Sequence, residues 1–239
     1  MGKEKSRGFR PLSPEQREKT IGPNLSFAAT EAYKLLRTNL SFSFPDQTGC
    51  RIIGVTSSLG GEGKSTTSIN LAYAMAQENK RVLLLEADLR LPTAAKYLKA
   101  KTAPGLSNLL AGQCSGTDIL QRSGLHKNFW VATAGDTPPN PSELLASQQM
   151  ATTIDTLKGF FDVIIVDLPP VTVVSDAIVL SKLTDGMILV TRRGFCDRKS
   201  VADAVRKLRF AGCRLLGFVM TGADVHKRGY SKTYYREID

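Results

Sequence analysis

The sequence predicts a single α/β domain with a doubly wound, mostly parallel sheet flanked by helices. The chain has 239 residues, 42% of them hydrophobic, which is enough to bury one large core. From Arg51 onward, short apolar segments alternate with longer segments of helical pattern. The short segments are apolar on both faces, as strands are in a parallel sheet covered by helices. This alternation is typical of doubly wound folds.

Three regions are expected along the chain. Residues 1–25 are polar and rich in proline, and they predict a flexible basic arm. Residues 26–222 carry the alternating pattern and predict the folded α/β domain. Residues 223–239 have no core pattern but hold three of the six tyrosines, which predicts a flexible, tyrosine-rich tail.

The first helix is expected after Ser26, and Pro45 and Gly49 end it. Its apolar residues recur at three- and four-residue spacing and form one stripe: Ala29, Ala32, Leu36 and Leu40. Strands are then expected at 51–57, 81–87, 129–135, 162–168, 186–192 and 213–222. Helices are expected at 64–79, 105–112, 175–183 and 197–212. A further helix begins at Pro141, with Asn140 as its predicted N-cap and Glu143 three residues after the cap.

Composition narrows the classes of function. The formal net charge of +10 indicates an anionic partner, which leaves nucleotide, acidic protein, membrane surface and nucleic acid open. Specific nucleic-acid binding ranks last, because no basic face interleaved with aromatic residues is visible. The four cysteines are far apart without CxxC spacing, which predicts buried reduced thiols and a cytosolic protein. No apolar run approaches the roughly 20 residues of a membrane span, and the N-terminus lacks a signal-peptide pattern.

The strongest motif is SLGGEGKST, residues 58–66, between an expected strand and an expected helix. Its glycines allow backbone N–H groups to surround an anion, Lys64 is expected to reach the outer phosphates, and Ser65 to bind Mg²⁺. A strict phosphate loop has glycine where this chain has Ser58, and an ordinary glycine-rich turn is the alternative. The intact GKST favours the phosphate loop. The predicted ATP-binding residues are Gly60, Gly61, Glu62, Gly63, Lys64, Ser65 and Thr66.

Acidic residues stand at the carboxyl ends of two expected strands. Glu86 and Asp88 follow one apolar run, and Asp167 ends another. Doubly wound sheets bind ligands at this edge, so the three carboxylates are expected near one Mg²⁺ beside Ser65. Each acid alone would be an ordinary loop cap. Together with the phosphate loop, Ser65, Asp88 and Asp167 are the predicted metal ligands.

In these residues the chain resembles the bacterial tyrosine kinases of capsule and exopolysaccharide synthesis. The likeness covers nearly the whole chain, through EAYKLLRTNLSFS, GGEGKST, LLLEADLRLPT, PPNPSELL, DVIIVDLPPV and the terminal tyrosines. It implies a Walker A motif at 58–65, a second acidic motif at 86–90 and a Walker B motif at 163–167. It also implies a separate cytoplasmic kinase, activated and recruited to the inner face of the membrane by the cytoplasmic segment of a transmembrane polysaccharide co-polymerase.

The resemblance further implies the reaction and the assembly. A neighbouring subunit in a ring would phosphorylate the tail at Tyr230, Tyr234 and Tyr235. The predicted catalytic residues are Lys64, Glu86, Asp88 and Asp167. A phenol has a pKa of about 10, so Glu86 or Asp88 is expected to orient or deprotonate it. The subunit contact would come from Glu31, Lys34 and Arg37, and a tyrosine phosphatase is an implied partner. Phosphorylated tails, made anionic, are expected to release the ring.

Four positions depart from related patterns. Glu86 stands where the family usually has Asp, and a misplacement of about an ångström can cost on the order of 100-fold in rate. Lys34 stands where the family has Arg, and it lacks the bidentate fork. Thr221 stands where relatives often have Asn near the adenine. Leu59 stands where division-site and chromosome-partitioning ATPases have a lysine, which argues against that subgroup.

Two other functions stay open. One is a switch that hydrolyses ATP without phosphorylating protein, and the other is a nucleotide-bound scaffold of the polysaccharide machinery with little catalysis. The departure at Glu86 is the feature that supports the scaffold. The alternative for the tail tyrosines is that they are chance residues in a disordered segment. The alternative for the charged residues of the first helix is a solvent-exposed stripe with i,i+3 pairing.

Overall fold

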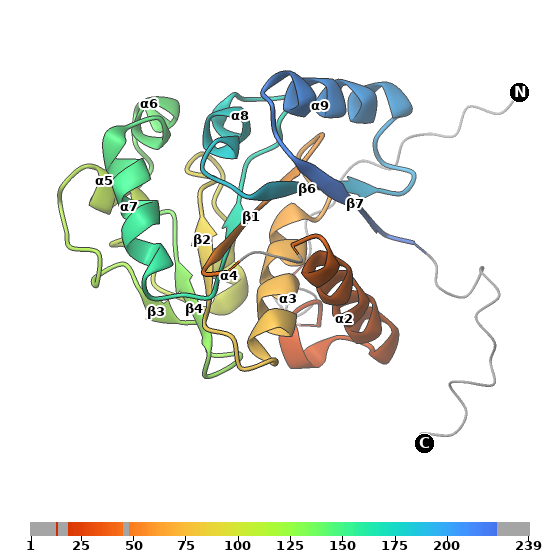
Figure 1. Cartoon of the computed structure of the whole chain (residues 1–239), viewed down its shortest axis with the longest axis horizontal. Helices are drawn as coiled ribbons and strands as arrows, with labels where there is room; N and C mark the ends of the chain where they lie inside the picture. The colour runs from red at the N-terminus through yellow and green to blue at the C-terminus, as the bar shows by residue number, and fades with distance from the viewer. Residues whose placement is uncertain (1–12, 14–18, 45–47, 224–239) are drawn as a thin grey trace, which may run out of the picture.

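The computed structural model describes Ser13 and residues 19–44 and 48–223. At its centre lies one seven-stranded sheet with the order β3-β4-β2-β5-β1-β6-β7 (Figure 1). The strands are β1 (Arg51–Ser57), β2 (Val82–Glu86), β3 (Gln121–Arg122), β4 (Phe129–Ala132), β5 (Val163–Asp167), β6 (Gly186–Arg192) and β7 (Leu215–Thr221). Every neighbouring pair is parallel except β3 and β4. The predicted doubly wound, mostly parallel sheet is therefore confirmed.

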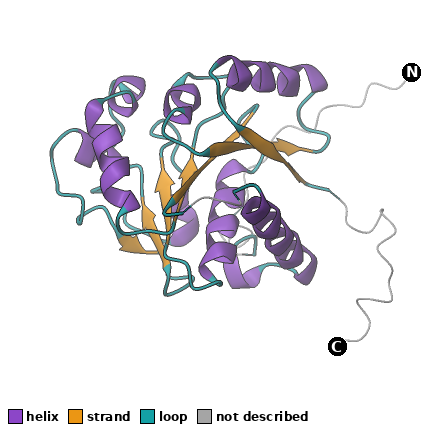
Figure 2. Cartoon of the chain, in the orientation of Figure 1, coloured by secondary structure: helices purple, strands orange, loops and turns teal. Residues whose placement is uncertain are grey.

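Helices cover both faces of the sheet (Figure 2). The first face carries α5 (Leu106–Leu110), α6 (Pro141–Leu145), α7 (Gln148–Lys158), α8 (Asp176–Ser181) and α9 (Arg198–Phe210). The second face carries the 3₁₀ turn η1 (Gly22–Asn24), α2 (Phe27–Phe42), α3 (Lys64–Ala76) and α4 (Ala94–Leu98). Figure 1 shows α9 on one side of β6 and β7, and α2 with α3 on the other. No helix in the described part of the chain is long and apolar enough to cross a membrane.

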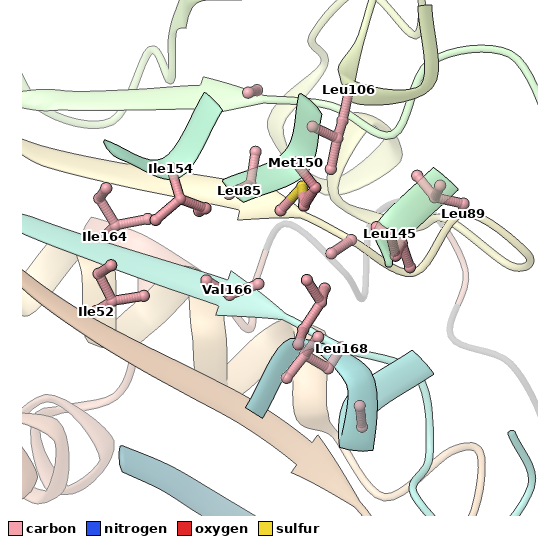
Figure 3. Packing of buried hydrophobic residues seen from close by; sticks show 14 of the residues in the cluster. Ile52, Leu85, Leu89, Leu106, Leu145, Met150, Ile154, Ile164, Val166 and Leu168 are labelled. Carbon is pink, nitrogen blue, oxygen red and sulfur yellow. The ribbon is translucent and has the colours of Figure 1, made fainter. Parts of the chain in front are cut away.

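The core is divided by the sheet into two clusters, because the central strands bury side chains on both faces. Leu83 and Leu85 of β2 face the first cluster, and Val82 and Leu84 face the second. Figure 3 shows the first cluster, in which Ile52, Leu85 and Ile164 of the sheet pack with Met150 and Ile154 of α7. The uninterrupted apolar runs of the sequence thus become strands buried on both sides.

Several elements depart from the sequence-based prediction. β3, α4 and α7 were not predicted. β3 has two residues and α4 has five, whereas α7 has 11 residues and buries Met150, Ile154 and Leu157 at helical spacing. The helix that begins at Pro141 ends at Leu145, and α7 then begins after Ser147, whose side chain accepts a hydrogen bond from Met150 N. Asn140 is the N-cap of this helix, as predicted, but its side chain makes no hydrogen bond to the helix backbone. Its amide instead donates to Glu143 at 2.8 Å.

The first helix is placed as predicted, with Ser26 accepting from Ala29 N at its start. The predicted apolar stripe is only partly right, because Leu40 is buried whereas Ala32 is exposed. The cysteines are free and half-buried rather than buried: Cys50, Cys114, Cys196 and Cys213. Burial is the main cause that raises the pKa of Cys50, Cys196 and Cys213 to about 11.

Candidate active site

The glycine-rich loop connects the carboxyl end of β1 to the first turn of α3, as the sequence predicts. Gly61 and Gly63 have φ of +85° and +93°, a conformation that favours glycine. Gly63 is the N-cap of α3, and a Cβ there would meet the Thr221 methyl group at 3.2 Å. The loop therefore places its backbone N–H groups and the positive end of the α3 dipole at the carboxyl edge of the sheet.

Lys64, in the first turn of α3, is held between two carboxylates. Its Nζ lies 2.8 Å from Asp88 Oδ2 and 3.8 Å from Asp167 Oδ1. It also lies 3.3 Å from the Ser65 hydroxyl. Asp88 follows β2 and Asp167 ends β5, and these two strands are neighbours in the sheet. The structure thus brings together the lysine, the serine and two of the three acids that the sequence predicts at this site.

Burial and charge act against each other in this cluster. Burial alone would lower the pKa of Lys64, but the carboxylates of Asp167 and Asp88 outweigh it and raise the pKa above its usual value. Burial raises the pKa of Asp167 despite the opposing charge of Lys64. A closely packed positive and negative pair of this kind is stable only while each charge has a partner.

One oxygen of this cluster lacks a hydrogen bond. Asp167 Oδ1 accepts from Ser68 at 3.2 Å, whereas Oδ2 is buried without a hydrogen-bond partner among the described residues. A buried carboxylate oxygen beside a hydroxyl is a suitable ligand for a hard cation. The described residues contain no cluster of three His, Cys, Asp or Glu side chains that would hold a metal by itself. The site fits Mg²⁺, which usually needs only one or two protein carboxylates besides phosphate and water.

Glu86 is placed differently from the other two acids. Its Oε1 accepts from the backbone N–H groups of Thr93 and Ala94 at 2.5 and 2.6 Å, and its Oε2 accepts from Ala134 N at 3.2 Å. Burial raises its pKa against these hydrogen bonds. Glu86 thus fastens the start of α4 and the end of β4 to β2. Both oxygens are already engaged, so the geometry does not support the predicted role of Glu86 in orienting an acceptor hydroxyl.

Glu62 fastens the phosphate loop, which sequence reasoning missed. Its fully buried carboxylate accepts from Leu59 N at 2.7 Å and from Arg192 N at 3.3 Å. Thr221 Oγ1 donates to the Glu62 carbonyl at 2.7 Å, and the Arg192 side chain donates to Gly61 O. The ends of β6 and β7 therefore hold the loop in place. A glutamate between two loop glycines was the only sequence signal for this.

A second network that was missed fixes the segment after β2. Arg90 contacts the buried carboxylate of Asp176 through Nε at 2.9 Å, and its Nη2 donates to Ser142 Oγ at 2.9 Å. Ser142 in turn donates to Asp176 at 2.5 Å. The segment that carries Asp88 is thereby tied to the first turns of α6 and α8. The stretches PSELL and SDA hold these partners, but no local pattern shows that they meet.

A cavity of about 750 Å³ opens from the phosphate loop. This volume is within the usual range for small-molecule sites. Its walls come from the loop, from the segment before α2, and from α2, α3, α4 and the ends of β6 and β7. Residues that line it include Lys19, Tyr33, residues 60–66, Asp88, Leu91, Lys96, Tyr97, Arg192 and Thr221. Glu86 is not among the lining residues.

The charged residues predicted as a subunit contact lie on α2. Lys34 pairs with Glu31 at 2.7 Å on a half-exposed surface. Arg37 instead faces α3, where its Nε lies 2.9 Å from Glu78 and its Nη1 donates to Ala74 O at 2.7 Å. Arg37 therefore serves the packing of α2 on α3 within one chain. The predicted phosphorylation sites, Tyr230, Tyr234 and Tyr235, lie outside the described residues.

The glycine loop between β1 and α3, with its buried lysine and flanking acids, defines the class: a P-loop nucleotide-binding protein. A family model described as "AAA domain" matches residues 50–196. The tyrosine-protein kinase YwqD of Bacillus subtilis (strain 168) is 37% identical over 198 residues, which cover 83% of either chain. The chain belongs to the family of bacterial tyrosine-protein kinases, and the resemblance seen in the sequence is confirmed.

Comparison with solved structures supports the same family assignment. The kinase domain of the Escherichia coli tyrosine kinase ETK matches with a TM-score of 0.81 at 31% identity, over 93% of this chain and 84% of that one. The chimerical protein CapA2B2 matches with a TM-score of 0.79 at 32% identity, over 85% and 88%. The septum site-determining protein MinD of Pyrococcus horikoshii OT3, solved with Mg-ADP, matches with a TM-score of 0.61 at 25% identity, over 72% and 70%.

Proposed function

We propose that the chain transfers the γ-phosphoryl group of ATP to tyrosines in the tail of a neighbouring copy, and that this reaction regulates capsule or exopolysaccharide synthesis and export. The observation that carries the proposal is the buried contact of Lys64 with Asp88 and Asp167 at the start of α3. Phosphoryl transfer depends mainly on positioning and on neutralising charge, and this cluster can do both.

The residues that hold ATP follow from the loop. The backbone N–H groups of residues 60–66 and the Lys64 ammonium group bind the phosphates. Ser65, Asp88 and Asp167 hold Mg²⁺, which supplies further positive charge against the phosphate oxygens. The orphaned oxygen of Asp167 supports this assignment. MinD, a neighbour in fold, was solved with Mg-ADP.

Asp88 is the carboxylate that serves the acceptor. Asp88 lines the cavity, and a backbone amide engages only its Oδ1, which accepts from Leu91 N at 3.0 Å, whereas both oxygens of Glu86 are engaged in this way. When ATP is bound, Lys64 turns from Asp88 to the phosphates, and Asp88 can then accept the hydrogen of a tyrosine hydroxyl. The phenol oxygen forms the new bond to the γ-phosphorus as the bond to ADP breaks. The phenol proton passes to Asp88 and then to water.

The acceptors are Tyr230, Tyr234 and Tyr235. Tyr234 is 11 residues beyond Ala223, the last described residue, and such a segment spans at most roughly 36–40 Å. This length exceeds the radius of gyration expected for the domain, about 18 Å. A tail can therefore reach the site of an adjacent copy. Each of the three phosphates would change the charge of the tail by about −1.5 to −2, which favours release of the tail from an acidic site.

We further propose a cytoplasmic kinase in a ring, held at the inner face of the membrane by the cytoplasmic segment of a transmembrane co-polymerase. Family membership supports the pairing with such an activator, and a tyrosine phosphatase would reverse the reaction. Within α2, Glu31 and Lys34 are half-exposed and available for a contact between copies. Arg37 contributes indirectly, by fixing α2 on α3.

Two measurements on one sample separate this proposal from an ATPase switch and from a scaffold. The full chain is incubated with ATP and Mg²⁺, with and without the activator's cytoplasmic segment, and both ADP and phosphotyrosine are quantified. Phosphotyrosine that disappears in Lys64→Met and Asp167→Asn supports the kinase. ADP release without phosphotyrosine supports the switch. Nucleotide binding without either product supports the scaffold and would overturn the proposal.

A further inference from the structure

The three most exposed phenylalanines of the described chain lie at one end of the sheet. Phe210 is 95% exposed, Phe42 is 76% exposed and Phe160 is 60% exposed. Phe42 and Phe210 are the last residues of α2 and α9, and Phe160 follows the end of α7. Aromatic rings that are mostly exposed contribute little to the stability of the fold, so three of them at one end indicate an external contact.

Their position follows from the topology. Phe160 precedes β5 and Phe210 precedes β7, so both lie at the amino edge of the parallel sheet. Phe42 reaches the same edge, because Arg51 at the start of β1 donates to Phe44 O at 3.2 Å, and Arg214 before β7 donates to Ser43 O at 2.6 Å. The phosphate loop lies at the opposite, carboxyl edge, at the far ends of strands roughly 17–23 Å long.

Cationic side chains surround these rings. Arg51 and Arg214 lie over the Phe44 ring, at 5.6 and 5.1 Å from its centre. Arg209, next to Phe210, is exposed. None of the three arginines forms an ion pair with a carboxylate of the described residues. Three other cations at this edge have acidic partners, in the pairs Lys80–Glu78, Arg81–Asp162 and Lys158–Asp155. Asp185, which precedes β6 at the same edge, accepts from Ile52 N.

We propose that this amino-edge surface, made of Phe42, Phe160, Phe210, Arg51, Arg209 and Arg214, binds the surface of an anionic phospholipid bilayer. Aromatic side chains that enter the headgroup region and basic side chains that pair with anionic headgroups are the features of proteins that lie on membranes. The positive charge of the surface, and of the chain as a whole, is complementary to such a bilayer.

The arrangement favours a bilayer over a second protein. The rings protrude singly from the ends of three different helices, and the strands β5 and β7 that follow two of them are three places apart, roughly 15 Å. A stable protein interface needs a continuous patch of about 800 Å² per partner. Separate aromatic rings surrounded by basic side chains are compatible with binding to the flat headgroup layer of a bilayer. On this surface the nucleotide site would face away from the bilayer, toward the cytoplasm.

Vesicle sedimentation of the full chain tests the proposal. Vesicles of phosphatidylcholine are compared with vesicles that also contain phosphatidylglycerol, at low and at high salt. The test variant is Phe42→Ser/Phe160→Ser/Phe210→Ser, and the charge variant is Arg209→Glu. The matched control is Val173→Ser, which removes a 64% exposed apolar side chain from the opposite edge. Thermal melting confirms that each variant is folded.

The wild-type chain and Val173→Ser are expected to sediment with the anionic vesicles only, and less at high salt. The triple variant should lose at least about tenfold in binding, and Arg209→Glu about fivefold or more. Binding that persists in the folded triple variant, or no binding by the wild type, would overturn the proposal. So would self-association of the wild type that the triple variant abolishes, because the surface would then bind a second copy.

Discussion

Lys64 Nζ lies 2.8 Å from Asp88 Oδ2, so the lysine that a phosphate loop directs at a nucleotide is paired here with the carboxylate proposed to serve the acceptor. In the proposed reaction, this pair links nucleotide binding to phosphoryl transfer. While Lys64 holds Asp88, neither residue would be available for transfer. Bound ATP would take over Lys64 and release Asp88, so that the acceptor is served only when phosphate is present.

Both members of this pair are expected to be essential. Lys64→Met removes charge stabilisation at the phosphates, and Asp88→Asn removes a metal ligand and the proton acceptor. Each should lower the rate of phosphotyrosine formation on a tail peptide by about 100-fold or more. Lys158→Met is the matched control, because Lys158 forms an exposed pair with Asp155 on α7. A Lys64→Met chain with more than half the wild-type rate would contradict the assignment.

Glu86 is expected to act on stability more than on chemistry. In Glu86→Asp the shorter side chain cannot reach all three amides, and in Glu86→Gln an amide group would face the Ala134 N–H. Leaving one buried N–H without an acceptor costs about 1–3 kcal/mol, which urea unfolding would detect. Neither variant should form phosphotyrosine faster than the wild type. A large gain in activity for Glu86→Asp would instead mean that the native residue limits catalysis.

Glu62 is expected to set the affinity for nucleotide. Glu62→Ala frees the Leu59 and Arg192 amides and loosens the loop from the ends of β6 and β7. The dissociation constant of a fluorescent ATP analogue should rise by about tenfold, the equivalent of one charged hydrogen bond. Glu62→Gln keeps one acceptor oxygen, and its dissociation constant should lie between those of the wild type and Glu62→Ala. Equal affinity of Glu62→Ala and the wild type would show that the loop needs no such support.

Two basic residues of α2 should behave differently. Arg37→Ala removes the contacts with Glu78 and Ala74, and it should destabilise the single chain by about 1 kcal/mol. Lys34→Ala removes only an exposed i,i+3 pair and should leave the melting temperature unchanged. If Lys34 belongs to a subunit contact, its variant should weaken assembly in analytical ultracentrifugation. Destabilisation by Lys34→Ala alone would reverse these roles.

The sheet was predictable because β1, β2, β5 and β6 are nearly uninterrupted apolar runs whose periodicity has a single interpretation. The phosphate loop and Asp88 and Asp167 were predictable because strand ends and loop glycines are visible locally. β3 was not, because two polar residues at an edge carry no pattern. The placement of Glu86 depends on the Ala134 amide, 48 residues away. Contacts at such separation are made by the tertiary fold and leave no local signal.

Transfer to the tail of another copy is the central claim, and one mixing experiment tests it most directly. The Lys64→Met chain, which can only accept phosphate, is incubated with ATP, Mg²⁺, the activator's cytoplasmic segment and a chain shortened after Ala223, which can only donate it. Mass spectrometry then examines the C-terminal peptide. We expect phosphate on Tyr230, Tyr234 or Tyr235 of the Lys64→Met chain. An unmodified tail, in a mixture that consumes ATP, would contradict the account.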